Sequence, residues 1–344
     1  MRFLRAAALA LAALSALPAA AEPFRFIQIS DTHQGRAIHQ WRYRQAIKQI
    51  NDLPFDIDVV VHTGDIVSAG FKSHDVAGAA SNLFSQIRWP RISCPGNHDL
   101  RFDKANDAWT NRYYRAATVY QVFFGPLAQS WETTNALYLA VDTEELRQAE
   151  APRLPGFDPL AWLEEKLSAA PPDKPVFVFT HVPDCDDYYL GRYTPGWTNE
   201  AGLAAWRSLL ARYPQVKAVI AGHFHRNARV EHPDGGPPTV IASSLAAFWD
   251  RQASYRVYSY EDGCLSYQDA YIEDPPEGTH INYAGFIVEP QPAEEAPAPS
   301  ADPPAAVDPS GAEAATAVDS SGAEAAVAVD PSGAEAAGHR PAAP

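Results

Sequence analysis

Residues 24–33 read FRFIQISDTH, an apolar stretch that ends in two residues able to bind a metal ion. The alternation and the β-forming residues of 24–30 predict a β-strand. Asp31 and His33 follow it two positions apart, so both side chains can project from one loop. In open α/β sheets, ligands bind beyond the carboxyl ends of the strands. This stretch therefore predicts an α/β protein whose chemistry begins directly after its first strand.

The same alternation of strands and helices continues along the chain. We expect further strands at 57–62, 91–94, 137–141, 176–180, 216–221 and 239–242. We expect helices at 39–51, 76–87, 159–169 and 200–211. Segments 255–260 and 264–271 predict a hairpin turned by Glu261-Asp262-Gly263. The first half therefore implies parallel βαβ units and the second half antiparallel additions.

Four more polar motifs directly follow apolar strands: Gly64-Asp65, Gly96-Asn97-His98-Asp99, His181 and Gly222-His223-Phe224-His225. One such motif alone is more often a turn former or a hydrogen-bonded cap. A series at successive strand ends is improbable by chance, and burying it without a metal would leave polar groups unpaired. Imidazole, carboxylate and amide ligands without thiolate favour Mn, Fe or Zn over soft metals. Asp65 stands within the series and has two oxygens, so it can bridge two ions.

The series resembles the calcineurin-like metallophosphoesterase family, whose pattern is DxH, GDxx(D/N), GNH(D/E), H and GHxH. The likeness covers about residues 24–271, and GFDPLAWLEEKL at 156–167 resembles the stretch before the single-His strand. It implies a four-layer α/β/β/α sandwich of two mixed sheets between helices. It also implies two divalent or mixed-valence ions of Mn, Fe or Zn. The implied ligands are Asp31, His33, Asp65 and His225 for the first ion and Asp65, Asn97, His181 and His223 for the second.

The resemblance also assigns catalytic roles. His98 would face the substrate phosphate without binding metal, and Asp99 would set its tautomer. A hydroxide bridging the ions would attack phosphorus, and His98 would protonate the leaving oxygen. The chain departs from the pattern at Ser68, where the family has Asp or Asn; this weakens one supporting hydrogen bond and removes no ligand. Purple acid phosphatases carry a Tyr ligand at that position, so the purple subgroup is excluded.

The expected reaction is hydrolysis of phosphomonoesters or phosphodiesters, with cyclic nucleotides or glycerophosphodiesters as candidate substrates. The alternative is a non-catalytic scaffold of the same fold that binds a partner, but the presence of every ligand and of His98 argues against it. A serine hydrolase is excluded because the chain has no GxSxG turn.

The two ends of the chain predict separate segments. Residues 1–21 combine Arg2 and Arg5, an apolar run at 6–17 and a small-residue cleavage site at 19–21, which predicts a signal peptide. An uncleaved anchor is the alternative, and no later stretch predicts a membrane helix. We expect an exported protein, periplasmic or secreted. Residues 22–288 would form the catalytic domain, and residues 289–344, with an eleven-residue repeat, a disordered tail.

Net charge and cysteine spacing limit the classes of ligand that we expect the protein to bind. The formal net charge is −15, which disfavours general binding of nucleic acid or anionic lipid, so we expect a small phosphate ester as the ligand. Cys94, Cys185 and Cys264 could give one disulfide and a free thiol, or no disulfide. None has CxxC spacing, which argues against sulfur-ligated zinc.

Other polar and aromatic residues have two interpretations each. His62 is expected inside the core, with support of the site as the alternative. The acidic run could line a substrate groove or be a solvated loop; it consists of Asp184, Asp186, Asp187, Tyr188 and Tyr189. Phe248 and Trp249 could stack on a base or an aromatic leaving group, or pack in the core. Four histidines are expected on the solvated surface: His39, His74, His232 and His339.

Overall fold

The computed structural model describes residues 23–71, 74–100, 108–189, 192–233, 235–248, 252–276, 280–281 and 287–288. The predicted signal peptide and tail, His339 and Trp249 lie outside these residues.

The first strand lies at the centre of a five-stranded sheet. β1 (Phe24–Ile29) pairs parallel with β2 (Val60–His62) and antiparallel with β12 (Ala253–Glu261). β3 (Arg91–Ser93) and β13 (Cys264–Ile272) complete the order β13-β12-β1-β2-β3. The β12–β13 turn has Asp262 at φ 48° and Gly263 at φ 82°, the conformation that an Asp-Gly hairpin turn requires.

The second sheet has six strands in the order β10-β11-β9-β6-β5-β4. Its members are β4 (Ala128–Glu132), β5 (Leu137–Val141), β6 (Val176–Phe179), β9 (Val216–Ala221), β10 (Ala228–Val230) and β11 (Thr239–Ile241). β5, β6, β9 and β11 are parallel, while β4 and β10 are antiparallel at the edges. Two small sheets pair β7 (Asp187–Tyr189) with β8 (Arg192–Thr194) and β14 (His280–Ile281) with β15 (Ile287–Val288).

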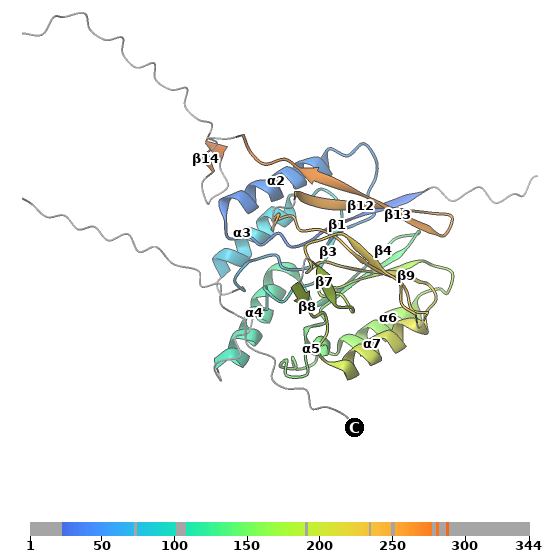
Figure 1. Cartoon of the computed structure of the whole chain (residues 1–344). Helices are drawn as coiled ribbons and strands as arrows, with labels where there is room; N and C mark the ends of the chain where they lie inside the picture. Colours follow the sequence, from blue (N-terminus) through green and yellow to red (C-terminus); the bar gives the residue numbers. More distant parts are fainter. Residues whose placement is uncertain are drawn as a thin grey trace, which may run out of the picture. The chain divides into compact units, whose positions relative to one another are not determined.

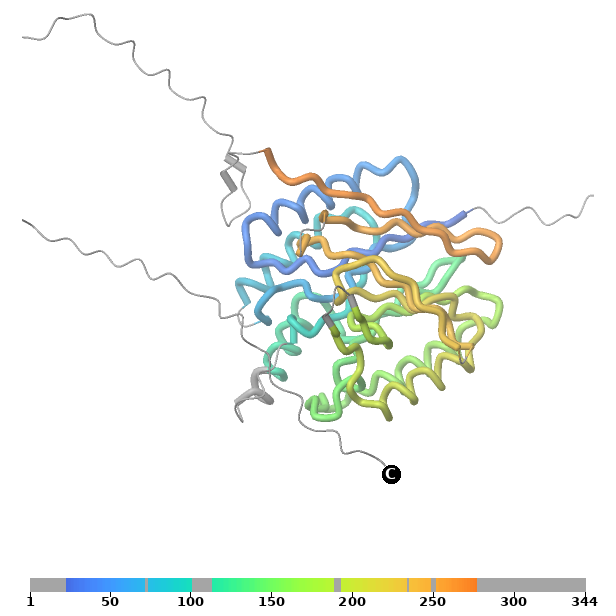
Figure 2. Tube along the Cα trace, viewed as in Figure 1, coloured from blue at the N-terminus to red at the C-terminus, as the bar shows by residue number. Residues whose placement is uncertain are grey.

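Helices cover the outer face of each sheet, as Figures 1 and 2 show. α2 (Ala37–Asn51) and α3 (His74–Ser85) pack on the five-stranded sheet through a cluster that includes Ile27, Ile47 and Leu83. α6 (Pro159–Ala169) and α7 (Glu200–Ala211) pack on the six-stranded sheet through Leu163 and Trp206. The predicted four-layer sandwich is confirmed. The elements that were not predicted from the sequence are α4 (Ala108–Phe124), α5 (Glu144–Arg147), β4, β7, β8, β10, β14 and β15.

The space between the sheets is filled by aromatic side chains and crossed by buried polar contacts, among them those of Gln28. Phe26 stacks on Tyr258 with ring centroids 4.8 Å apart. Gln28, fully buried beside them, donates from Nε2 to the Ala221 carbonyl at 2.8 Å and to Thr63 Oγ1 at 3.0 Å, and accepts from the Tyr258 hydroxyl at 2.7 Å. Ala221 belongs to the six-stranded sheet, whereas Gln28 and Tyr258 belong to the five-stranded sheet. Gln28 therefore connects the two sheets near the ends of their parallel strands.

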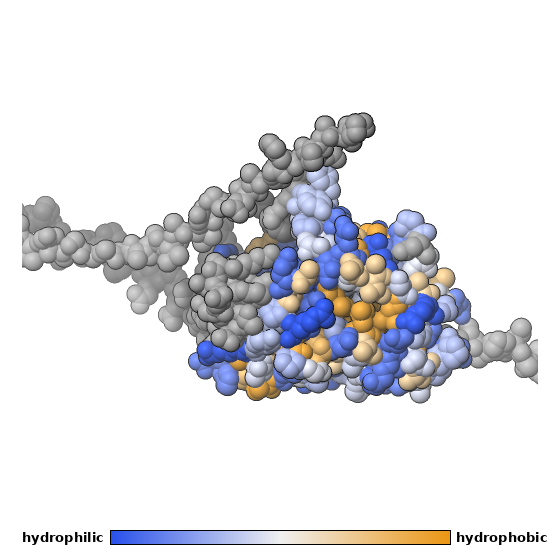
Figure 3. All heavy atoms as spheres, turned by 90° about the horizontal axis from the view of Figure 1, so that it is seen from below, coloured by the Kyte–Doolittle hydropathy of each residue, from blue (hydrophilic) through white to orange (hydrophobic). Residues whose placement is uncertain are grey.

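Two further expectations concern membrane helices and disulfide bonds. Figure 3 views the molecule from the side of α6 and α7 and shows hydrophobic atoms in the middle of this face with hydrophilic ones around them. Within the described residues, the helices are all too short or too polar to cross a bilayer. All three cysteines are free: Cys94 is buried, Cys185 half-buried and Cys264 exposed.

Candidate metal centre

The predicted ligands lie at one edge of the molecule because the strands that precede them are parallel within each sheet. Asp31, Asp65 and Asn97 follow β1, β2 and β3; His181 follows β6, and His223 and His225 follow β9. Backbone hydrogen bonds hold the loops together, from Asp31 to Gly64 at 3.0 Å and from Gly222 to His181 at 3.0 Å. Each sheet therefore contributes part of the centre.

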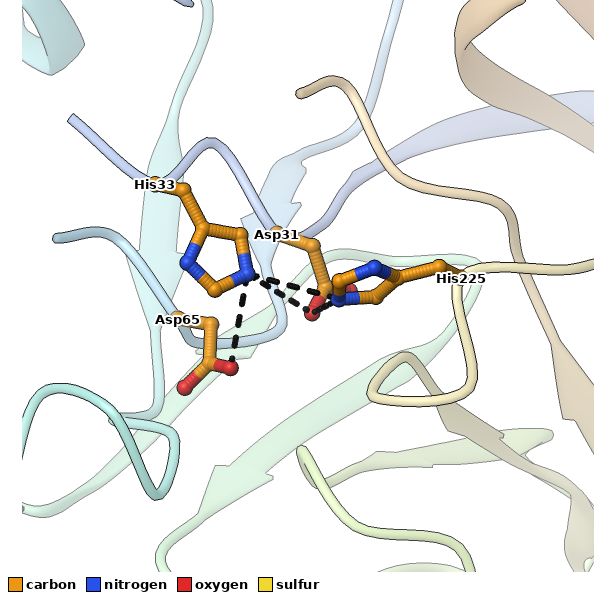
Figure 4. Close-up of side chains that lie close together, drawn as sticks. All are labelled: Asp31, His33, Asp65 and His225. Carbon is orange, nitrogen blue, oxygen red and sulfur yellow. Dashed lines mark hydrogen bonds and ion pairs between the residues drawn. The ribbon is translucent and has the colours of Figure 1, made fainter. Parts of the chain in front are cut away.

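The first group consists of Asp31, His33, Asp65 and His225, shown in Figure 4. Each offers one ligand atom, and these atoms all lie within 4.8 Å of one another. His225 Nε2 lies 3.0 Å from Asp31 Oδ1 and 3.3 Å from His33 Nε2. His33 Nε2 in turn lies 3.6 Å from Asp65 Oδ2. All four residues are buried. They are the four that were predicted to hold the first ion.

The second group shares Asp65 and adds His181 and His223. His181 Nε2 lies 3.2 Å from Asp65 Oδ2 and 3.1 Å from Asn97 Oδ1. Its Nδ1 donates to the Thr63 carbonyl at 2.7 Å, so Nε2 carries the lone pair in the neutral ring. All seven predicted ligands are thus brought together, and Asp65 belongs to both groups, as a bridging ligand must.

Backbone strain is concentrated at the predicted ligands. Seven non-glycine residues among those described have a positive φ, and five of them are predicted ligands. They are Asp31 (54°), His33 (43°), Asp65 (51°), His223 (68°) and His225 (51°). Such conformations cost about 1–3 kcal/mol each and persist where the surrounding structure fixes them, commonly at functional sites. The backbone is bent to turn oxygen and nitrogen lone pairs toward common points, which suits divalent cations.

The electrostatics of the groups agree with metal binding. Burial by itself would raise the pKa of the Asp31 and Asp65 carboxyls. The neighbouring His225 nevertheless holds the pKa of Asp31 well below its ordinary value. His181 does the same for Asp65. Burial lowers the pKa of His33 to about 4, so its imidazole is neutral near pH 7. Burial opposes the charged form of His181, but the Asp65 carboxylate raises its pKa to about 10. A bound cation would take the place of that proton.

Gly96 and Gly222 must be glycines because neighbouring atoms occupy the space that a Cβ would need. A Cβ on Gly96 would lie 2.3 Å from Asp65 Oδ1. A Cβ on Gly222 would lie 1.9 Å from Ser30 Oγ and 2.5 Å from Asp31 Oδ2. Any side chain at these positions would therefore displace a predicted ligand.

His98 lies beside the first group and is only partly buried. Its ring centroid is 4.9 Å from that of His33, and its backbone N–H donates to Asp65 Oδ1 at 2.7 Å. Its Nδ1 donates to the backbone carbonyl of Ser68 at 2.8 Å. The prediction that Asp99 sets the tautomer of His98 is therefore wrong. The Ser68 hydroxyl donates to the His33 carbonyl at 2.9 Å, so this position also supports a ligand loop.

Asp99 instead holds the loop that carries Asp65. Its buried carboxylate accepts from three backbone N–H groups: Ile66 at 3.1 Å, Val67 at 2.9 Å and Gly96 at 2.9 Å. His98 and Asp99 thus bond to different backbone groups, although they are adjacent in the sequence. Burial is the main cause that raises the pKa of Asp99 to about 7, and the negative charge of the nearby Asp65 adds to it.

Three other histidines support the interior. His62 accepts from the Gly64 N–H at 3.2 Å through Nδ1, and its Nε2 lies 3.1 Å from Thr32 Oγ1, so it is a core residue in contact with the ligand loops. The prediction that His39 and His232 lie on the surface is wrong. His39 is 4% exposed, with Nδ1 2.7 Å from the His33 carbonyl, and His232 Nε2 lies 3.0 Å from Thr239 Oγ1. His74 is exposed, as predicted.

The acidic run is held by the protein itself, which neither interpretation anticipated. Asp184 is buried and accepts from Thr239 at 2.6 Å, while Asp187 pairs with Arg226. Asp186 accepts from Tyr193 at 2.8 Å. These contacts fix the segment between His181 and α7.

Comparison with known proteins agrees with the geometry. The sequence matches the calcineurin-like phosphoesterase family over residues 24–227. The 3′,5′-cyclic adenosine monophosphate phosphodiesterase CpdA of Escherichia coli K12 is 27% identical over 236 residues, which cover 62% of this chain and 74% of that protein. A probable glycerophosphodiester phosphodiesterase, GpdQ, of Arcobacter nitrofigilis is 28% identical over 218 residues, covering 58% and 71%.

The fold has solved counterparts as well. The purple acid phosphatase PPD1 of yellow lupin superposes with a TM-score of 0.50 at 15% identity, over 72% of this chain. The chain spans about half of that protein, 51% of its length, and the likeness shows the fold alone. Together with the match over residues 24–227, these findings show that the chain belongs to the calcineurin-like phosphoesterase family.

Proposed function

We propose that this phosphoesterase hydrolyses phosphate diesters at a centre of two metal ions. The observation that carries the proposal is the membership of Asp65 in both ligand groups. The relatives named CpdA and GpdQ support the choice of diesters, because both names describe phosphodiesterases.

The first ion would be held by Asp31, His33, Asp65 and His225, and the second by Asp65, Asn97, His181 and His223. When bound, such ions polarise the phosphoryl group and lower the pKa of water, which supplies a nucleophile at neutral pH. The donor set suits Mn, Fe or Zn.

His98 is the residue that we assign to proton transfer. A carbonyl oxygen only accepts hydrogen bonds, so the contact with Ser68 requires the proton on Nδ1 of His98. Nε2 is then an acceptor in the neutral ring and a donor in the cation. Because His98 is partly exposed beside His33, a bound phosphate could reach it, and its cation could protonate the leaving oxygen.

We also propose that the protein is exported and works in the periplasm or outside the cell. Residues 1–21 carry the charge, apolar run and cleavage site of a signal peptide. Mass spectrometry of protein recovered from the periplasm or medium should show a chain that begins at Glu22. Recovery of intact chain from the cytoplasm alone would contradict export.

The activity is tested with bis-p-nitrophenyl phosphate and p-nitrophenyl phosphate, each with Mn, Fe or Zn restored to the metal-free protein. We expect metal-dependent turnover and a higher kcat/KM for the diester. Asp65→Asn should abolish turnover in every arm. Asp58→Asn is the matched control, because Asp58 precedes β2 at its other end, where it accepts from Tyr138 at 2.9 Å. Turnover that survives chelation or Asp65→Asn would refute the metal centre, and preference for the monoester would refute the substrate class.

A further inference from the structure

The loop after β11 brings an aromatic ring against the first group of ligands. Phe248 lies in this loop and is partly buried. Its ring stacks on His225 with centroids 5.0 Å apart and planes 19° apart. It meets His33 edge to face at 4.9 Å and 86°, and His39 at 5.5 Å and 78°. One ring thus contacts both imidazoles of the first group.

The loop that carries Phe248 is fastened to the strand end that carries Asp31. The N–H groups of Leu245 and Ala246 donate to the carbonyls of Ser30 and Asp31 at 3.0 and 3.1 Å. Ser244 Oγ also donates to the Asp31 carbonyl at 3.0 Å, and Arg42 donates to the Ala246 carbonyl. The position of the ring is therefore tied to the position of Asp31.

Backbone strain directly before Phe248 also indicates that the position of its ring is fixed. Ala247 has φ 56°, a left-handed conformation that residues with a Cβ rarely adopt. Strain of this kind persists where the surrounding contacts fix it and is common at functional sites.

We propose that Phe248 is a positioning residue for the first metal ion, an inference that rests on the proposed metal centre. His33 and His225 follow strands of different sheets, and their rings point toward each other in Figure 4. Their Nε2 atoms lie 3.3 Å apart. An imidazole that is free to rotate loses rotamer entropy when it binds a metal. Phe248 holds both rings in the orientation that the ion requires before the ion arrives. It also covers one face of the His225 ring, which lowers access of water to that ligand. His39, in contact with both Phe248 and the His33 carbonyl, completes the support.

The test is calorimetric titration of metal-free protein with Mn²⁺, with variants that separate the ring from its volume. Phe248→Leu keeps an apolar side chain and removes the ring, while Phe248→Tyr keeps the ring. Phe177→Leu is the matched control, because Phe177 is a fully buried ring whose aromatic neighbours are core residues such as Phe26 and Tyr138. Asp31→Ala identifies the first ion, since Asp31 belongs to the first group alone.

We expect Phe248→Leu to weaken that ion about tenfold, the size of a favourable aromatic contact, and to leave the other ion unchanged. Phe248→Tyr should bind like the wild type, and Phe177→Leu should lower the melting temperature with both affinities intact. The visible spectrum of bound Co²⁺ should change in Phe248→Leu and stay like that of the wild type in Phe248→Tyr and Phe177→Leu. A wild type that binds two ions, together with unchanged affinities in Phe248→Leu, would refute the role of Phe248 only. A wild type that binds no metal would refute the metal centre as well.

Discussion

Replacing Gly222 by alanine adds one methyl group where the end of β9 touches the end of β1. On the present backbone this methyl lies 1.9 Å from Ser30 Oγ and 2.5 Å from Asp31 Oδ2. An ordinary contact needs about 3.5 Å, so the two side chains must retreat by about 1–1.6 Å. Asp31 cannot move freely, because its Oδ2 accepts from Ser30 Oγ at 2.5 Å and from the His223 N–H at 3.1 Å. The methyl group must therefore displace a predicted ligand or open the junction between the sheets.

The expected losses follow from that displacement. Overpacking of this kind costs about 1–3 kcal/mol. For a domain of this size each kcal/mol lowers the melting temperature by about 2–4 °C, so we expect a fall of about 2–12 °C. A misplacement of about 1 Å in a catalytic centre can cost about 10²-fold in rate, and we expect kcat/KM for bis-p-nitrophenyl phosphate to fall by that factor. The metal content should fall toward one ion per chain.

Gly78→Ala is the control for Gly222→Ala. Gly78 lies in α3, and its added methyl would meet the Phe123 ring at 3.4 Å, an ordinary contact. Alanine also favours a helix more than glycine does, so stability should stay the same or rise with activity unchanged. If Gly222→Ala retained wild-type turnover and two ions per chain, the proposed rigidity of the Asp31 loop would be refuted.

Four further predictions follow from the centre and the ends of the chain. Asp65→Ala should lose most of both ions and Asp31→Ala mainly one, as elemental analysis would show; equal losses would contradict the assignment of Asp65 to both groups. His98→Ala should keep both ions yet lose about 10²–10⁴ in turnover, and the loss should be smaller for nitrophenyl esters, which need no proton on the leaving group; a lost ion would make His98 a ligand. Chelation should lower the melting temperature by roughly 5–10 °C per ion, because ligand at one hundred times Kd stabilises by about 2.7 kcal/mol; an unchanged melting curve would argue against bound metal. Deletion of residues 289–344 should leave activity and melting temperature unchanged, and a fall in either would place the tail on the catalytic domain.

The strand ends and most helices could be predicted because their signals are local. α6 and α7 have the bounds expected from the sequence. At α6, Asp158 accepts from the Ala161 N–H at 3.0 Å and Pro159 occupies the first turn, both helix-start signals. The motif residues could be placed because parallel strands bring their carboxyl ends to one edge.

α4 was missed although its sequence carries a helical period. Tyr113, Ala116, Ala117 and Tyr120 are buried at the spacing of one helix face. Its many aromatic and β-branched residues have only moderate helix propensity, so the local signal is weak and packing decides. β4 was missed because it is an edge strand with mostly exposed side chains, which leaves little alternation to detect.

Two of the errors share one cause, which is contact with backbone carbonyls. His98 and His39 are oriented by the carbonyls of Ser68 and His33, and a backbone oxygen leaves no mark in the residue types. The contact of Phe248 with both imidazoles was equally beyond prediction, since it depends on how the loop after β11 crosses to β1. The residues that meet at the centre could be predicted from the sequence, whereas the residues that hold them in place could not.

The division of the ligands between the two sheets also determines when the centre can form during folding. His33 and His225, whose Nε2 atoms lie 3.3 Å apart, are separated by 192 positions in the chain. Contacts between such distant segments form late, because closing a long loop costs entropy before any contact compensates for it. An emerging or unfolded chain presents only isolated Asp-x-His or His-x-His pairs. Tight uptake of metal must therefore await the docking of the two sheets, and the protein would acquire its ions in the compartment where it completes folding.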